Sequence, residues 1–178
     1  MWRCPIPTWL FTRTSKERSD QEPPDGMTRM IKIRNYSESD WHAIERIHDA
    51  ARKIELKFAG MEEAFLPLSV AAEREGLFAY PGLFVAEQDG QVVGFAACTE
   101  DELAWLYVDP PKTRTGIGRT LSEYALNAFP GIRYIEALKG NEPALALYKS
   151  LGFKLVDIKK GYMPGNESFA VEVYDLRR

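Results

Sequence analysis

Apolar residues follow two different periods along the chain, and these periods predict its secondary structure. Alternating or short continuous apolar runs predict β-strands. They cover residues 31–35, 82–87, 91–98, 103–108, 132–138, 153–158 and 169–176. Asp89 and Gly90 stand between the second and third runs. Because an Asp-Gly pair favours a tight turn, these two runs are predicted to form a β-hairpin.

A longer period of three to four residues predicts helices. The clearest apolar stripe ends before Gly60 and consists of Trp41, Ile44, Ile47, Ala51, Ile54 and Phe58. Residues 61–75 indicate a second helix that is interrupted near Pro67. Residues 117–128 indicate a third helix and residues 142–151 a short fourth one, while residues 161–166 are predicted to form a loop.

Hairpins near the start and strand–helix–strand units near the end predict an α/β (α+β) fold. We expect a mixed, mostly antiparallel sheet of six to seven strands with helices on both faces. The length of 178 residues suits one domain with a single core, assigned to residues 30–178. Residues 1–29 are predicted to be a disordered extension. Their short apolar run is broken by Pro5 and Pro7, unlike the apolar segment of a signal peptide.

Charge and residue usage argue against several classes of function. A net charge of −3 gives no basic surface for nucleic acid or an anionic membrane, and it suits a cationic substrate. No apolar stretch reaches the length that crosses a bilayer. Cys4 and Cys98 provide no disulfide framework, which favours the cytoplasm. His42 and His48 are too few for a histidine metal site, so no metal is expected, and both are predicted to lie at the surface.

The most specific chemistry lies between the strand at residues 103–108 and the helix at residues 117–128. Gly116 and Gly118 leave backbone N–H groups uncovered where the helix begins, and Arg114 and Arg119 flank them. Free N–H groups at the positive end of a helix dipole bind anions, and phosphate is the natural occupant. The segment matches neither a P-loop nor the dinucleotide fingerprint, which needs a third glycine.

Two segments resemble the Gcn5-related N-acetyltransferases, the GNAT superfamily. Residues 108–118 resemble its acyl-CoA loop, V-x-P-x-x-[RQ]-x-x-G-x-[GA], except that Thr113 stands where Arg or Gln is usual. Residues 141–153 resemble the N-x-x-A-x-x-x-Y-x-x-x-G-F element that follows the fifth strand. This second segment is also similar to the ribosomal-protein alanine N-acetyltransferases. The resemblance extends over residues 30–178 and implies a GNAT-like fold.

The resemblance implies direct transfer of an acetyl group from acetyl-CoA, as co-substrate, to a primary amine. The acceptor would be a small molecule, a peptide or a protein N-terminus. The pantetheine arm would pair with Leu106, Tyr107 and Val108, and the Val108 N–H would meet the thioester carbonyl. The phosphates would be held by Arg114, Thr115, Gly116, Ile117, Gly118 and Arg119. The alternative is a non-catalytic CoA-binding or interaction module, in which the two arginines are exposed charges.

Three residues are candidates for the reaction itself, and Asn141 is a candidate for binding the coenzyme. The resemblance makes Tyr148 the acid that protonates the departing thiolate, although an aromatic residue here can also serve packing alone. Glu136 and Glu102 are candidate bases or else solvated carboxylates, and a chain of water molecules without a single base is a third option. Asn141 can bond the pantetheine amide, cap the helix that begins there, or do both.

The acceptor pocket is expected from residues 54–80 and 160–168, the segments in which this family varies with substrate. Aromatic and apolar residues of the first segment either line that pocket or belong to the core: Phe58, Met61, Phe65, Phe78 and Tyr80. A homodimer through the final strands is compatible with the resemblance.

Overall fold

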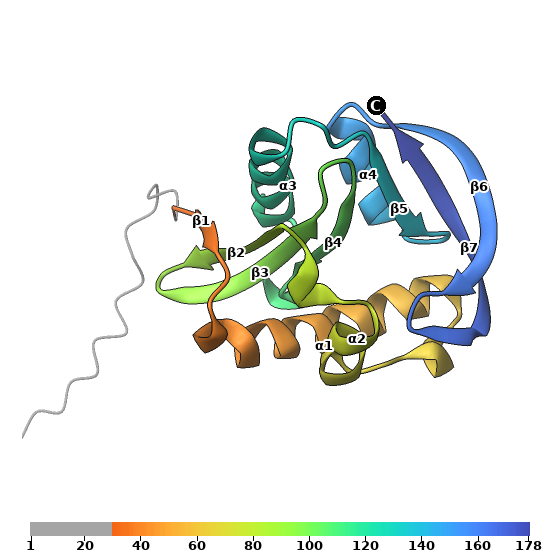
Figure 1. Ribbon diagram of the computed structural model, residues 1–178, viewed down its shortest axis with the longest axis horizontal. Helices are drawn as coiled ribbons and strands as arrows, with labels where there is room; N and C mark the ends of the chain where they lie inside the picture. Colours follow the sequence, from red (N-terminus) through yellow and green to blue (C-terminus); the bar gives the residue numbers. More distant parts are fainter. Residues whose placement is uncertain (1–29) are drawn as a thin grey trace, which may run out of the picture.

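The strands form two antiparallel sheets that meet at one point (Figure 1). The computed structural model describes residues 30–178, and the predicted N-terminal extension lies outside the described residues. The first sheet has the order β1-β2-β3-β4 and the second the order β5-β7-β6. Their bounds are β1 Lys32–Asn35, β2 Gly82–Gln88, β3 Gln91–Cys98, β4 Leu103–Val108, β5 Tyr134–Leu138, β6 Lys154–Met163 and β7 Asn166–Arg177. A parallel bridge between Glu102 and Tyr134 joins the sheets.

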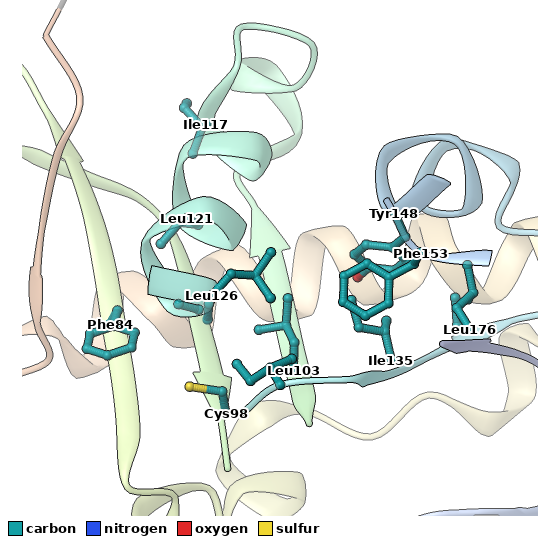
Figure 2. Packing of buried hydrophobic residues seen from close by; sticks show 14 of the residues in the cluster. Phe84, Cys98, Leu103, Ile117, Leu121, Leu126, Ile135, Tyr148, Phe153 and Leu176 are labelled. Atoms are coloured by element: carbon teal, nitrogen blue, oxygen red, sulfur yellow. The ribbon is translucent and has the colours of Figure 1, made fainter. Parts of the chain in front are cut away.

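Helices cover both faces of the strands, as the sequence predicts. α1 (Trp41–Ala59) and α2 (Leu68–Arg74) pack against one face of β2, β3 and β4, while α3 (Ile117–Ala128) and α4 (Glu142–Ser150) share a core with the other. Figure 2 shows this second core, where Tyr148 of α4 lies with Phe153 and Ile135. Each helix therefore buries its apolar stripe against the strands.

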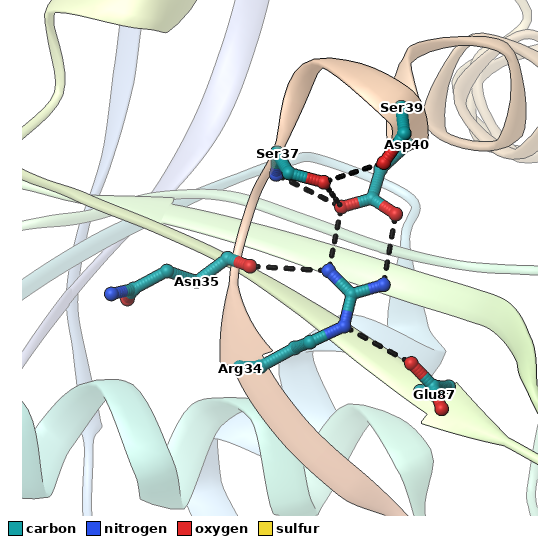
Figure 3. A network of polar contacts seen from close by, with 6 residues as sticks. All are labelled: Arg34, Asn35, Ser37, Ser39, Asp40 and Glu87. Atoms are coloured by element: carbon teal, nitrogen blue, oxygen red, sulfur yellow. Dashed lines mark hydrogen bonds and ion pairs between the residues drawn. The ribbon is translucent and has the colours of Figure 1, made fainter.

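α1 is anchored at its start by an ion-pair network (Figure 3). Arg34 of β1 donates to both carboxylate oxygens of Asp40, at 2.7 and 2.9 Å, and to Glu87 of β2 at 3.0 Å. The arginine holds the pKa of Asp40 at about 2, well below its usual value. Asp40 also accepts the N–H of Ser37 at 2.9 Å. The network therefore ties the entry of α1 to the edge of the first sheet.

Three expectations about local structure need correction. Residues 161–166 are not a loop, because β6 continues to Met163, β7 begins at Asn166, and only a tight turn separates them. The helical segment at residues 61–75 is interrupted before α2 as predicted, but its first part, Glu62–Ala64, is only a 3₁₀ turn. His48 is buried, with 2% of its surface exposed, because the α1 face beside the apolar stripe is also covered by β4.

Candidate active site

A gap between β4 and β5 forms the centre of the candidate site. The Asp101 carbonyl accepts the N–H groups of Arg133 and Tyr134, at 2.8 and 3.0 Å, at the end where the two strands meet. Beyond the bridge at Glu102, β4 and β5 share no backbone pairing within residues 30–178. The two strands diverge from that closed end in Figure 1. The parallel strands β4 and β5 therefore lack backbone hydrogen bonds along the edges that face each other.

The backbone N–H and C=O groups of alternate β4 residues point into this gap. The N–H of Asp109 donates to Val93 of β3 at 2.9 Å, and Val108 lies opposite Gly94. Because antiparallel pairing alternates along a strand, the N–H and C=O groups of Leu106 and Val108 point away from β3. Their side chains meanwhile pack in the core beside α3. The backbone groups of Tyr107 face β3 instead, and its side chain lies on the α1 side.

The loop after β4 leads to a helix N-terminus rich in free donors. The N–H groups of residues 114–119 find no hydrogen-bond acceptor in the described part of the chain, and the first helical bond runs from Thr120 to Gly116 at 2.9 Å. Gly116 has φ of 92°, a backbone conformation that glycine adopts without strain. The uncovered N–H groups at the start of α3 agree with the sequence, and the binding of an anion by them stays a prediction.

The side chains of this loop mostly bind the protein itself. Arg119 donates to Ser150 at 2.7 Å and to Glu123 at 3.3 Å, so it links α3 to α4. The hydroxyl of Thr113 donates to the Pro110 carbonyl at 2.9 Å, and that of Thr115 to the Lys112 carbonyl at 2.6 Å. These contacts shape the loop and leave its backbone donors uncovered.

α4 brings Asn141 and Tyr148 to the open side of the gap. The Oδ1 atom of Asn141 accepts the Ala144 N–H at 3.2 Å, so Asn141 caps the helix, and its Nδ2 atom donates to Glu55 at 3.3 Å. Tyr148 is 6% exposed, and its hydroxyl makes no hydrogen bond to the other described residues. Because no buried side-chain N or O atom of residues 30–178 lacks a partner, this hydroxyl must reach the solvent-accessible surface. Burial first, and then the charge of Glu55, raise the pKa of Tyr148 far above its ordinary value.

The two predicted bases, Glu102 and Glu136, lie together at the closed end of the gap. Lys159 of β6 contacts Glu136 at 3.4 Å and Asp175 at 2.7 Å. Burial, and then the neighbouring Glu136, raise the pKa of Glu102. The carboxylate whose charge acts on Tyr148 is neither of these but Glu55, so the structure separates the predicted bases from the predicted acid.

Sequence reasoning missed a polar group on α1 that faces Tyr107. Arg52 donates to Glu55 at 2.6 Å, and the Tyr107 hydroxyl donates to the same carboxylate at 3.4 Å. The His48 ring meets Tyr107 edge-on, with ring centroids 4.9 Å apart. His48, Arg52 and Glu55 recur at helical spacing beside the apolar stripe. This polar stripe could have indicated a functional face of α1, but the sequence near it does not show which strand that face contacts.

Glu75, which follows α2, was missed as well. Burial raises its pKa to about 7, and Glu167 adds to the rise while Arg52 opposes it. The pKa values of Tyr80 and Tyr107 are both raised in part by the charge of Glu75. A carboxylate with a pKa near neutrality can gain and lose a proton under physiological conditions.

A surface hollow of about 580 Å³ lies next to the start of α4. It is lined from the end of α1 by Phe58 and Met61, from β6 by Lys160, and from β7 by Glu172 and Tyr174. Of the residues expected to shape the acceptor pocket, Phe58 and Met61 do line this hollow. Phe78 instead contacts Tyr36 and Trp41, and Phe65 contacts Lys53. Tyr80 packs in the core between α1 and the first sheet.

A family match covers the middle of the chain, from β2 to the start of β6. Residues 80–155 match the family described as the acetyltransferase (GNAT) domain. The peptidyl-lysine N-acetyltransferase YiaC of Escherichia coli K12 is 34% identical over 85 residues, which are 47% of this chain and 58% of YiaC. The N-alpha-acetyltransferase RimI of Mycobacterium tuberculosis is 33% identical over 102 residues, which are 52% of this chain and 63% of RimI. The chain thus spans less than two thirds of either relative.

Solved structures show the same fold. Apo YjaB from Escherichia coli has a TM-score of 0.62 and 25% identity, covering 83% of this chain and 97% of YjaB. The ribosomal-protein-S18-alanine N-acetyltransferase from Escherichia coli has a TM-score of 0.61 and 24% identity, covering 83% and 92%. The described residues thus have the fold of GNAT acetyltransferases, and the middle of the chain is similar in sequence to the acetyltransferase (GNAT) domain.

Two features are absent from the described residues. Within residues 30–178, no helix is both long and apolar enough to cross a membrane. The same residues contain no group of three or more His, Cys, Asp or Glu side chains arranged to hold a metal ion.

Proposed function

We propose that this chain is an acetyl-CoA-dependent N-acetyltransferase that moves an acetyl group directly to a primary amine. One observation carries the proposal: the unpaired edge of β4 ends at Val108, and the free N–H groups of residues 114–119 follow within a few residues. An extended pantetheine arm paired with that edge leads to a diphosphate at the start of α3. Both surfaces are backbone, so the departure at Thr113 leaves them intact.

The proposed reaction needs no covalent enzyme intermediate. The neutral amine nitrogen attacks the thioester carbon, a C–N bond forms, and the C–S bond breaks. The Val108 N–H donates to the carbonyl oxygen, on which negative charge develops. Cys98 supports direct transfer, since burial raises its pKa to about 11 and leaves it a thiol rather than a nucleophilic thiolate.

Tyr148 is proposed as the donor to the departing sulfur. Its hydroxyl makes no hydrogen bond within residues 30–178, and burial raises its pKa, which keeps it protonated over the physiological range. A thiol has an ordinary pKa of about 8.5, so full proton transfer from this phenol to a thiolate is uphill. Tyr148 therefore acts first as a hydrogen-bond donor that stabilises the developing negative charge on sulfur.

Removal of the amine proton is proposed for the carboxylates on the α1 side of the gap. Glu102 and Glu136 are the candidates that the resemblance supplies, and burial raises the pKa of Glu102 toward the range of an effective base. Glu75 has the same property, with a pKa of about 7. A base is needed because a lysine amine has an ordinary pKa of about 10.4 and is protonated at neutral pH.

The acceptor is proposed to carry an ammonium group and to approach from the α1 side. Glu55, Glu75 and Glu102 place negative charge there, and Arg52 offsets only part of it. The hollow beside α4 provides room for the rest of the acceptor. The names of YiaC and RimI point to lysine and N-terminal amines in those proteins, so both kinds of amine belong in a test panel.

Calorimetry with CoA and an assay of free-thiol release test the proposal. We expect CoA to bind and thiol to appear when acetyl-CoA is supplied with an accepted amine, among free lysine, spermidine and peptides with a free N-terminus. Binding without thiol release on any amine would instead support the non-catalytic module. No binding heat would remove the phosphate-site assignment itself.

A further inference from the structure

Glu55 of α1 connects three elements that line the gap. Its Oε2 atom accepts from Arg52 at 2.6 Å and from the Tyr107 hydroxyl at 3.4 Å, and its Oε1 atom accepts from Asn141 at 3.3 Å. Tyr107 belongs to β4 and Asn141 begins α4. One carboxylate therefore holds both sides of the gap, although β4 and β5 are not paired to each other there.

Close backbone packing places Glu55 at this point. A Cβ atom on Gly140, which has φ of 101°, would lie only 2.6 Å from the Phe58 carbonyl oxygen. The last turn of α1 can thus lie directly against the junction of β5 and α4. Glu55 stands almost one turn earlier on the same helix, which brings its side chain beside Asn141.

The contacts of Glu55 also determine how Asn141 is oriented. A carboxylate only accepts hydrogen bonds, so the amide of Asn141 must turn its Nδ2 donor toward Glu55. Its Oδ1 atom is then left to accept the Ala144 N–H and cap α4. One Nδ2 hydrogen and one Oδ1 lone pair stay free, in a known orientation, for a ligand in the gap.

Aromatic contacts fix the position of the Tyr107 side chain as well. Its ring stacks on Phe95, with centroids 5.5 Å apart, and meets the edge of His48 at 4.9 Å. A displacement of the Tyr107 hydroxyl would therefore disturb β4 itself rather than a free side chain. The bridge through Glu55 transmits the position of β4 to α4, which carries Tyr148.

We propose that Glu55 is a positioning residue for acetyl transfer: by bridging Tyr107 and Asn141, it sets the Tyr148 hydroxyl relative to the Val108 N–H. This inference depends on the proposed function, because these two groups act on the sulfur and the carbonyl oxygen of one thioester. Small errors in such a distance are costly, since catalysis requires both groups to be aligned in the transition state. The carboxylate works through Tyr107 and Asn141 and does not touch the reacting atoms.

Glu55→Gln is the test, because glutamine keeps the size of the side chain but replaces one acceptor oxygen with a donor. We expect kcat for thiol release to fall about 10- to 100-fold while KM for acetyl-CoA changes less than about threefold. Glu45→Gln is the matched control, as it removes a carboxylate from the same helix outside the bridge and should leave both constants unchanged.

A double-mutant cycle separates positioning from a general structural role. If Glu55 acts through Tyr148, then Glu55→Gln should cost less than about threefold in kcat once Tyr148→Phe is present. An equal loss of kcat in both backgrounds, or no loss in the wild-type background, would overturn the proposal.

A measurement without turnover keeps the inference distinguishable from the proposed function. The side-chain amide resonances of Asn141 in an ¹⁵N-labelled NMR spectrum should shift in Glu55→Gln and stay in place in Glu45→Gln. Unchanged Asn141 resonances would disprove the bridge even if no amine is accepted. Absence of turnover with a shifted Asn141 signal would reject the proposed function and the catalytic role of Glu55, while keeping the contact.

Discussion

Backbone groups line one side of the gap between β4 and β5, and side chains line the other. The α3 side offers backbone: the unpaired edge of β4 and the N–H groups of residues 114–119. The α1 side offers side chains: Arg52, Glu55 and Glu75 gather there around Tyr107. A backbone site tolerates changes of side chain but depends on glycine. A side-chain site is sensitive even to isosteric substitutions.

The largest expected effect tests the backbone side. Gly118→Asp should weaken CoA binding about 100-fold, equivalent to about 2.7 kcal/mol. A Cβ atom at this position would lie 3.4 Å from Leu147 and 3.6 Å from Val108, which places a carboxylate in the gap beside the proposed phosphate site. Calorimetry with CoA measures the loss.

Gly118→Ala is the control for this prediction. Its Cβ fits at ordinary contact distance, so it adds bulk without charge and should change CoA affinity only a few-fold. Equal CoA affinity in wild type and Gly118→Asp would mean that no anion sits at the start of α3.

The next effect concerns Tyr148, where the two sides meet. Tyr148→Phe should lower kcat at least tenfold, with little change in acetyl-CoA affinity, because it removes only the donor to the departing sulfur. Steady-state thiol release and calorimetry measure the two quantities. Tyr124→Phe, which removes the hydroxyl of a more exposed tyrosine on α3, is the control. An unaltered rate would restrict Tyr148 to packing.

Glu75→Gln tests the α1 side of the gap through its effect on the free energy of unfolding. The pKa of Glu75 is raised to about 7 from an ordinary value of 4.5, so the folded state favours its protonated form. The resulting stability is present below pH 4.5 and is lost as pH rises through 7. Glutamine resembles the protonated carboxyl. The variant should therefore match wild type near pH 4 and exceed its free energy of unfolding by about 2 kcal/mol near pH 8.

Urea unfolding at both pH values measures this difference. The control is Glu73→Gln, an exposed carboxylate of α2, which should follow wild type at both pH values. A variant that loses stability at pH 8 would show that ionised Glu75 is favourably paired, contrary to this interpretation of the α1 side.

The smallest effect concerns the anchor that brings α1 to the site. Arg34 holds the pKa of Asp40 at about 2, so this contact stabilises the fold above pH 3.8 and is lost as pH falls through 2. Asp40→Asn should lower the free energy of unfolding at pH 7 by about 1 kcal/mol, since Arg34 is partly exposed and screened. The difference between the variant and wild type should shrink as pH falls toward 2.

Unfolding curves at pH 7 and pH 3 provide the comparison for Asp40. Glu38→Gln changes an exposed carboxylate of the same turn and should have little effect. A constant difference between Asp40→Asn and wild type across this range would attribute the loss to packing instead of charge.

Local sequence was enough to predict most of the elements and the free backbone donors at the start of α3. The apolar periods predicted the seven strands, and Gly116 and Gly118 marked the free donors at the start of α3. The segment from Asn141 to Tyr148 likewise indicated one short helix that Asn141 caps and that carries Tyr148. Each of these features depends on residues that are close together in the sequence, so a local pattern is enough to predict it.

Only the tertiary structure decided which side chains meet on the α1 side of the gap. Glu55 and Asn141 are 86 residues apart, and Glu55 and Tyr107 are 52 apart, so no local pattern could pair them. His48 was expected at the surface and is buried because β4 lies against that face of α1. Such contacts depend on how whole elements pack, which in turn depends on the summed burial of many residues. The sequence by itself thus determined where free backbone N–H groups begin α3, and the packing of α1 against β4 and α4 decided which carboxylate contacts Tyr107 and Asn141.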